Sequence, residues 1–179
     1  MKSLMASVME GLSSLRSKTQ AVMALESTSD CAGSMKRSLD LHNIEQALLH
    51  TPVGSHLITA RKFYIHHGIY LGAGRVAHYA GYSGSFTPGP IEVTDLEQFA
   101  NGRPVWMIEE QSEYTSDEIV RRAYSRIGER HYRIFSNNCE HFCSWCTHGK
   151  SQSAQVELLL HSPRGFFSMI SALESRLTA

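Results

Sequence analysis

The sequence has no excess of charge of either sign and no long apolar run. Its 17 Lys and Arg balance 17 Asp and Glu, so the formal net charge is zero over 179 residues. A chain this neutral indicates neither a nucleic-acid-binding surface nor a polybasic membrane patch. Because no uncharged apolar run approaches the length that spans a bilayer, we expect no transmembrane segment and only peripheral contact with a membrane.

We expect no secretory signal either. The N-terminus has one early Lys, but Glu10 interrupts the apolar stretch that a signal peptide needs. We therefore expect a protein that is cytoplasmic or is delivered without a signal peptide.

Cysteine is scarce, and its placement excludes a disulfide scaffold. Three of the four cysteines, Cys139, Cys143 and Cys146, fall in one stretch that we expect to be helical. Three cysteines on one helix cannot form a disulfide framework, which indicates a chain kept reduced. They share a helix face, so zinc must be considered, but no second pair of ligands accompanies them. We expect no metal and no cofactor, with Cys143 and Cys146 as small core residues.

What the chain does have is enough apolar sequence, 42% of its residues, for a buried core. Residues 1–45 are Ser- and Met-rich and predict a helical or partly disordered extension. After them, alternating and β-branched patterns predict strands, and longer periodic stretches with caps predict helices. The strands are expected over 55–62, 63–71, 75–80, 91–93 and 104–109, and the helices over 115–128, 139–149, 153–160 and from 163 onward. Strands first and helices later indicate the α+β class with an antiparallel sheet.

Asn138 and Cys139 are the first candidate site residues. Asn is a good helix N-cap, which would put Cys139 at the first helical position. A thiol there lies at the positive end of the helix dipole, so we expect a lowered pKa and a thiolate at neutral pH. The backbone amide of Cys139 would be a ready oxyanion donor. Such a nucleophile still needs a base.

The hairpin over 63–80 supplies histidines. A three-residue loop at 72–74 would make His66 and His78 diagonal neighbours on one face of the sheet, roughly 7–8 Å apart, with His67 on the other face. A two-residue turn would put His66 and His78 on opposite faces. With the thiol, the pair forms a Cys-His-His set in which one imidazole takes the proton and the second orients the first. His141, two residues after Cys139, is turned away and is interpreted as structural.

These motifs resemble the lecithin:retinol acyltransferase (LRAT) family, which are circularly permuted papain-like proteins related to the NlpC-type cell-wall peptidases. The resemblance runs from about residue 52 to 156, through His66–Leu71, Val76–His78, Val93–Phe99, Asn138–Phe142 and Ser153–Val156. It implies a permuted papain-like fold and makes His66 the base, His78 the third residue and Cys139 the nucleophile. The family's members move fatty acyl groups from phospholipids, through an acyl-thioester on the cysteine, to water, an amine or an alcohol. Many relatives carry a C-terminal transmembrane anchor, and in this sequence we expect none.

The sequence therefore predicts an LRAT-like catalytic domain over 46–157, followed by an amphipathic helix over 158–179. The expected activity is that of a phospholipase A-type acyl hydrolase or acyltransferase on a phospholipid substrate. Two alternatives stay open: a cysteine peptidase or amidase of the NlpC type acting on cell-wall peptides, and a non-catalytic metal-binding or packing module. A small phospholipase without a signal peptide would also suit a toxin domain, with an inhibitor or immunity protein as partner. The apolar residues of the last helix are expected to cover the core more readily than to enter a membrane interface.

Overall fold

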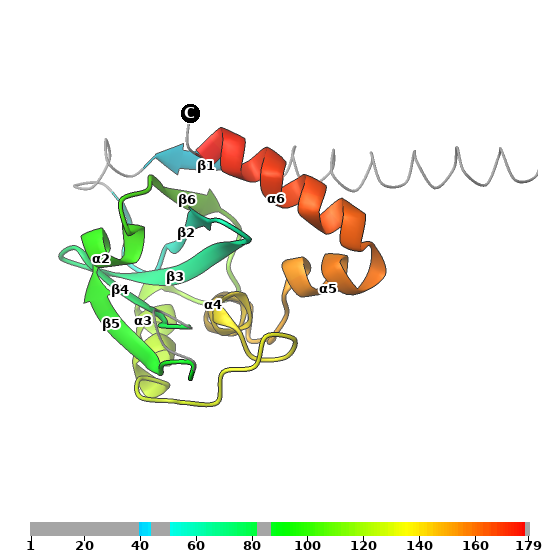
Figure 1. The fold of residues 1–179 in the computed structure, drawn as a ribbon. Helices are drawn as coiled ribbons and strands as arrows, with labels where there is room; N and C mark the ends of the chain where they lie inside the picture. Colours follow the sequence, from blue (N-terminus) through cyan, green and yellow to red (C-terminus); the bar gives the residue numbers. More distant parts are fainter. Residues whose placement is uncertain (1–39, 44–50, 82–86, 178–179) are drawn as a thin grey trace, which may run out of the picture. The chain divides into compact units, whose positions relative to one another are not determined.

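The computed structural model describes residues 40–43, 51–81 and 87–177 (Figure 1). The expected extension over 1–45 lies outside the described residues except at its end. There Asp40–Asn43 form strand β1, which pairs with β6 (Val105–Glu109), so the assignment of these four residues to the extension is wrong. A strand of four residues carries too little periodicity to be recognised, and its pairing partner lies far along the chain.

The sheet has six strands in the order β1-β6-β2-β3-β4-β5, and every neighbouring pair is antiparallel. Together with the helices it confirms the predicted α+β class. The central strands are β2 (His56–Arg61), β3 (Tyr64–Gly72) and β4 (Arg75–Tyr79), and β5 (Ile91–Asp95) is an edge strand. The helices are α2 (Leu96–Ala100), α3 (Ser116–Ser125), α4 (Cys139–His148), α5 (Ala154–His161) and α6 (Pro163–Leu177).

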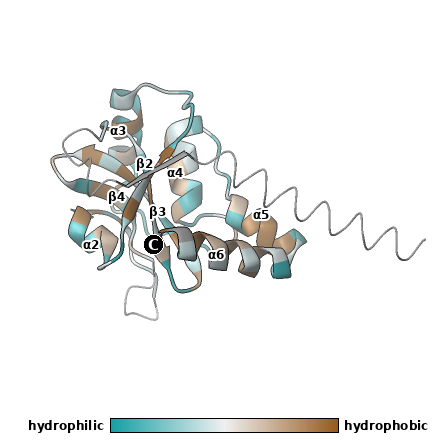
Figure 2. Cartoon of the chain, turned by 90° about the horizontal axis from the view of Figure 1, so that it is seen from above, coloured by the Kyte–Doolittle hydropathy of each residue, from teal (hydrophilic) through white to brown (hydrophobic). Residues whose placement is uncertain are grey.

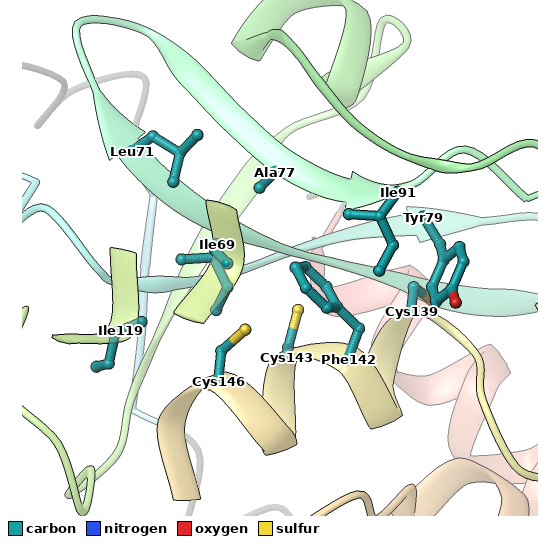
Figure 3. Packing of buried hydrophobic residues seen from close by; sticks show 11 residues of the cluster. Ile69, Leu71, Ala77, Tyr79, Ile91, Ile119, Cys139, Phe142, Cys143 and Cys146 are labelled. Carbon is teal, nitrogen blue, oxygen red and sulfur yellow. The ribbon is translucent and has the colours of Figure 1, made fainter. Parts of the chain in front are cut away.

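Both faces of the central strands are covered, which is why β3 is buried over most of its length. On one face, Ile69 and Leu71 pack with the buried side of α4 and with Ile119 of α3. Figure 3 shows Phe142, Cys143 and Cys146 on the side of α4 that faces the strands. On the other face a second cluster forms around Phe99 of α2. Figure 2 shows the hydrophobic residues concentrated on the central strands between the helices.

The turn between β3 and β4 differs from the expected one. Gly72 pairs with Arg75, so only Ala73 and Gly74 lie between the strands. Both have positive φ, 50° and 72°, as a tight two-residue hairpin turn of the primed type requires. The predicted three-residue loop is therefore wrong. Ala73 adopts a left-handed conformation, which an alanine in the sequence does not indicate.

The expected register nevertheless holds. The pairing shifts between Tyr70 and Gly72, which marks a bulge that adds one residue to β3. Past the bulge Ile69 pairs with Ala77, the same register that a three-residue loop would produce. The side chains of the hairpin histidines therefore alternate between the faces as predicted.

Local capping defines the ends of α4. The Asn138 side chain accepts hydrogen bonds from the backbone amides of Glu140 and His141, at 3.0 and 3.1 Å, and Gly149 closes the helix in a left-handed conformation. Cys139 is thus the first helical residue, as the sequence predicted.

The last helix, α6, buries one side against the rest of the domain. Phe166, Met169 and Ile170 are buried, whereas Phe167 points outward with 58% of its surface exposed. The segment therefore mainly covers the core, as expected. Within the described ranges, none of the helices combines the length and apolarity needed to cross a bilayer.

Candidate active site

One cleft of about 1160 Å³ collects the three residues that the sequence singled out. His66, His78 and Cys139 all line it. The two histidines lie on the face of the sheet that α2 covers, against Phe99. Helix α4 packs on the opposite face, and its first residue brings the thiol to the same cleft.

The two imidazoles are in direct contact. Nε2 of His66 lies 3.0 Å from Nδ1 of His78, and the rings are nearly perpendicular. Phe99 packs against both rings at centroid distances of 5.2 and 5.4 Å. Gly68 makes this packing possible, since a Cβ there would come within 2.8 Å of the Phe99 ring.

The second ring is held by two further contacts. Nε2 of His78 lies 3.0 Å from the hydroxyl of Thr94, and its Nδ1 lies 2.9 Å from the carbonyl oxygen of Tyr79. The Tyr79 carbonyl can only accept, so its contact is a hydrogen bond when Nδ1 of His78 carries the proton. In the other tautomer the proton is on Nε2 and is donated to Thr94, and Nδ1 of His78 gives up the bond to Tyr79 and accepts from Nε2–H of His66. In that tautomer Nδ1 of His66 carries a free lone pair.

Nδ1 of His66 is the one feature of this pair that the fold leaves unsatisfied. It is buried and has no hydrogen-bond partner among the described residues. Burial of an unpaired ring nitrogen costs stability, which points to a group that a reaction uses. Burial lowers the pKa of His66 well below its usual 6.5, and the repulsion between two protonated rings when His78 is also charged lowers it further, so the ring is neutral at pH 7.

Cys139 is not the preformed thiolate that its helix position predicts. The side chain is 4% exposed, and burial raises the pKa of the thiol to about 12. The backbone amides of His67 and Glu140 favour the thiolate, but they are outweighed. The expectation of a lowered pKa is therefore wrong, because the free energy needed to bury a charge exceeds the electrostatic stabilisation that one helix N-terminus provides.

The amide of His67 reaches the sulfur at the place where two strands separate. The ladder between β3 and β4 ends at the Ile69–Ala77 pair, although both strands continue beyond it. His67 thus turns its backbone N–H toward the Cys139 thiol, which it helps to stabilise as a thiolate. Sequence inspection assigned no role to this amide.

The side chain of His67, which the sequence placed on the face away from His66 and His78, belongs to a buried chain of hydrogen bonds. Gln155 Nε2 donates to Nε2 of His67, and Nδ1 of His67 lies 2.8 Å from Nε2 of His56. Nδ1 of His56 then lies 2.8 Å from the carboxylate of Glu110. Each of these hydrogen bonds has one donor and one acceptor when His56 and His67 are both neutral and carry the proton on Nδ1. We refer to Glu110, His56, His67 and Gln155 as the buried chain.

Gln155 also joins the strand of the base to the helix of the thiol. Its Oε1 accepts from the amide of Ile65 at 2.8 Å, and its Nε2 donates to the carbonyl of Ile65 at 3.1 Å. The same Nε2 lies 3.1 Å from the carboxylate of Glu140, the residue after Cys139. Gln155 lies within a motif that the sequence flagged, but nothing in the sequence pairs it with residues 88 and 90 positions away.

A second polar network anchors the loop that leads into Cys139. Arg126 donates to both carboxylate oxygens of Glu129 at 2.7 Å. The hydroxyl of Tyr79 donates to Glu129, and Asn137 donates to Tyr79 and Glu129 at 2.9 Å each. The hydrogen bond from Arg126 is the main reason that the pKa of Glu129 falls to about 2.

The remaining candidates have structural positions. His141 completes a capping box with Asn138 at the start of α4. Cys143 and Cys146 are fully buried in the core, and burial raises the pKa of both thiols. In the part of the chain that the structure describes, no group of three His, Cys, Asp or Glu side chains is arranged to hold a metal ion.

The fold and the site thus define a class of protein: an α+β domain that holds a buried thiol and two contacting imidazoles in one cleft. Residues 50–152, more than half of the chain, match the family model of lecithin retinol acyltransferase, and the chain belongs to this family. It is 30% identical over 132 residues to lecithin retinol acyltransferase of Rattus norvegicus, a match that covers 58% of this chain and 57% of that protein. The proteins of the same name from Mus musculus and Homo sapiens are 28% identical over equal shares. The chain therefore spans little more than half the length of these curated relatives.

Proposed function

We propose that the chain is a thiol-dependent acyl hydrolase or acyltransferase that acts on phospholipid esters through an acyl-thioester on Cys139. The observation that carries the proposal is the unpartnered Nδ1 of His66, a neutral buried base that lines the same cleft as the thiol. Family membership supports acyl transfer as the reaction, and the relatives' name contains a phospholipid, lecithin.

In the first half-reaction the Cys139 thiol gives its proton to Nδ1 of His66 while the sulfur attacks the ester carbonyl. The carbonyl oxygen takes up the negative charge and is stabilised by the backbone amides of His67 and Cys139. The intermediate collapses with cleavage of the carbon–oxygen bond, and the proton on His66 passes to the departing lysolipid alcohol. The acyl group remains on the sulfur as a thioester.

In the second half-reaction water, an alcohol or an amine attacks the thioester. Nδ1 of His66 takes a proton from this acceptor, and the acyl–sulfur bond breaks. The proton then returns to the sulfur, which restores the thiol. While His66 is doubly protonated, its Nε2–H donates to Nδ1 of His78, which orients the ring and stabilises its charge.

The resting pair is neutral because both groups are buried. The pKa of Cys139 lies far above 7, and that of His66 lies well below 6.5. Proton transfer therefore accompanies the attack on substrate and does not precede it.

The residues that line the cleft include apolar side chains and one arginine, which suits a phospholipid. Ile65, Val156 and Leu159 provide apolar surface for an acyl chain. Arg61 lines the cleft and donates to the carbonyl oxygens of Phe99 and Ala100 at the end of α2, at 2.6 and 3.2 Å. Its positive charge complements the phosphate of a lipid headgroup.

Mass spectrometry of the products from mixed phospholipids tests the proposal. We expect free fatty acid with lysolipid, or an acylated acceptor, and no product from Cys139→Ala or His66→Ala. Cys146→Ala, which removes a thiol from the same helix outside the cleft, is the matched control and should retain turnover. Turnover of cell-wall peptides without lipid turnover would replace the proposal with a cysteine peptidase, and full activity of Cys139→Ala would refute a thiol mechanism.

A further inference from the structure

Several exposed apolar side chains line the cleft or directly follow residues that line it. Among the residues whose burial the structure describes, the large apolar side chains that stay exposed are Val53, Phe63, Tyr64, Tyr124, Ile127, Ile134, Phe135, Leu160 and Phe167. Phe63, Tyr64, Ile134 and Phe167 line the cleft, and Phe135 and Leu160 directly follow lining residues in the sequence. We define the rim as Phe63, Ile134, Phe135, Leu160 and Phe167.

The rim is assembled from separate parts of the fold. Phe63 lies in the turn between β2 and β3, while Ile134 and Phe135 lie in the loop before α4. Leu160 and Phe167 come from α5 and α6. Five large side chains exposed by 49–65% leave on the order of 500 Å² of apolar surface in contact with water. Scattered exposed apolar residues need no explanation, but a cluster of this size around an opening indicates a binding surface.

Basic residues lie in the same segments of the chain as the rim residues. In the segments 61–64, 132–136 and 157–167 the charged residues are Arg61, Lys62, Arg133, Arg164 and, as the one acid, Glu157. Lys62, Arg133 and Arg164 are exposed, and Nζ of Lys62 lies 5.3 Å from the centre of the Phe63 ring. Apolar side chains interleaved with Lys and Arg are the pattern that inserts among lipid headgroups and attracts anionic lipid.

We propose that the rim is the surface by which the protein docks on a lipid bilayer that contains anionic lipid. The inference rests on the proposed function, because it supplies the route by which a phospholipid enters the cleft. A protein seated on the rim would close the opening, whereas a bilayer held there presents substrate directly to it. The four-to-one excess of basic over acidic residues in the rim segments also favours an anionic surface.

Vesicle sedimentation tests docking without chemistry when it is performed on Cys139→Ala. In that background, Phe135→Ser/Leu160→Ser removes two rim residues that do not line the cleft. We expect it to bind vesicles of phosphatidylcholine and phosphatidylserine at least about tenfold more weakly than the parent. Tyr124→Ser/Ile127→Ser is the matched control, because these residues are exposed but neither line the cleft nor adjoin the residues that do, and it should bind as the parent does. Thermal melting of each variant confirms that it is folded.

Charge is tested separately with Arg133→Glu. We expect it to weaken binding to the vesicles with phosphatidylserine and to leave binding to phosphatidylcholine alone unchanged. Equal binding by the Phe135→Ser/Leu160→Ser variant and its parent, or equal loss in the Tyr124→Ser/Ile127→Ser control, would overturn the inference.

Turnover of a short-chain phospholipid below its micellar concentration separates the two proposals. With Cys139 restored, the Phe135→Ser/Leu160→Ser variant should hydrolyse this monomeric substrate at the parent's rate while losing activity on vesicles. Turnover by a protein that binds no vesicle would leave the proposed function standing and refute docking. Vesicle binding that depends on the rim, in a protein that turns over no lipid, would support docking and refute the proposed function.

Discussion

Removing the Gln155 side chain should loosen the connection between the base and the nucleophile. Gln155→Ala deletes the hydrogen bonds to both backbone groups of Ile65, to His67 and to Glu140. Ile65 directly precedes His66, and Glu140 directly follows Cys139. The substitution therefore acts on the relative position of the two reacting groups without touching either of them.

The size of the effect can be worked out from the contacts that are lost. The amide and carbonyl of Ile65 and Nε2 of His67 are left without their partner, and an unsatisfied buried polar group costs about 1–3 kcal/mol. Gln155 lines the cleft, so water can replace part of what is lost. We expect the free energy of unfolding to fall by about 2–4 kcal/mol. A displacement of His66 by a fraction of an ångström to one ångström should lower kcat by about 10- to 100-fold.

Urea unfolding and steady-state turnover measure the two effects, with Gln152→Ala as the matched control. Gln152 lies three positions earlier, is exposed, and is not among the residues that line the cleft. Gln155→Glu is the sharper variant, because it keeps the size of the side chain but sets a second carboxylate against Glu140. The reasoning is refuted if Gln155→Ala changes kcat and stability no more than Gln152→Ala does.

Four further outcomes follow from burial and charge. The pKa of Glu129 is about 2 against an ordinary 4.5, so its contribution to stability is complete above pH 4.5 and is lost as the pH falls toward 2. Glu129→Gln should lower the free energy of unfolding at pH 7 by about 1–2 kcal/mol, discounted for partial exposure, and should flatten acid unfolding over that range; an unchanged acid limb contradicts this. Cys143→Ser puts a hydroxyl in the core and should cost about 1–3 kcal/mol in urea unfolding, whereas no loss would deny tight packing there. Gly68→Ala places a Cβ within 2.8 Å of the Phe99 ring, so we expect about 1–3 kcal/mol of destabilisation with reduced kcat, and wild-type values for both would argue against that packing. Because the pKa of Cys139 is about 12, iodoacetamide should alkylate the free enzyme at pH 7 more slowly than it alkylates cysteine in solution, and fast alkylation at pH 6 would instead reveal a preformed thiolate.

The electrostatics of the site explain why a helix N-terminus alone is a weak predictor of reactivity. Asn138 caps α4 as predicted, and the amides of the first turn do favour the charged sulfur. Burial of Cys139 disfavours the charged sulfur, and this effect on the thiol pKa is larger than that of the amides. A site that keeps both partners neutral avoids the cost of a buried ion pair at rest, and it needs a base whose lone pair is free, which Nδ1 of His66 supplies.

The sequence by itself determined the local features. Alternation located the strands from β2 to β6, helical periodicity and capping residues located α3 to α6, and Asn138 placed Cys139 at the start of its helix. The two-residue repeat of a strand put His66 and His78 on one face and His67 on the other. These features depend on interactions within a few residues, so the pattern of the chain carries them.

Tertiary structure decided what depends on groups far apart in the chain. The hairpin register is set by a two-residue turn together with a bulge in β3, and β1 exists through its pairing with β6. The buried chain joins residues 11 to 88 positions apart, and the high pKa of Cys139 reflects how completely the rest of the fold covers it. The rim around the cleft is visible only once four separate segments meet. Periodicity and capping reflect interactions between residues that are close in the sequence, so they can be recognised in it. Burial and contacts between distant residues exist only in the folded chain.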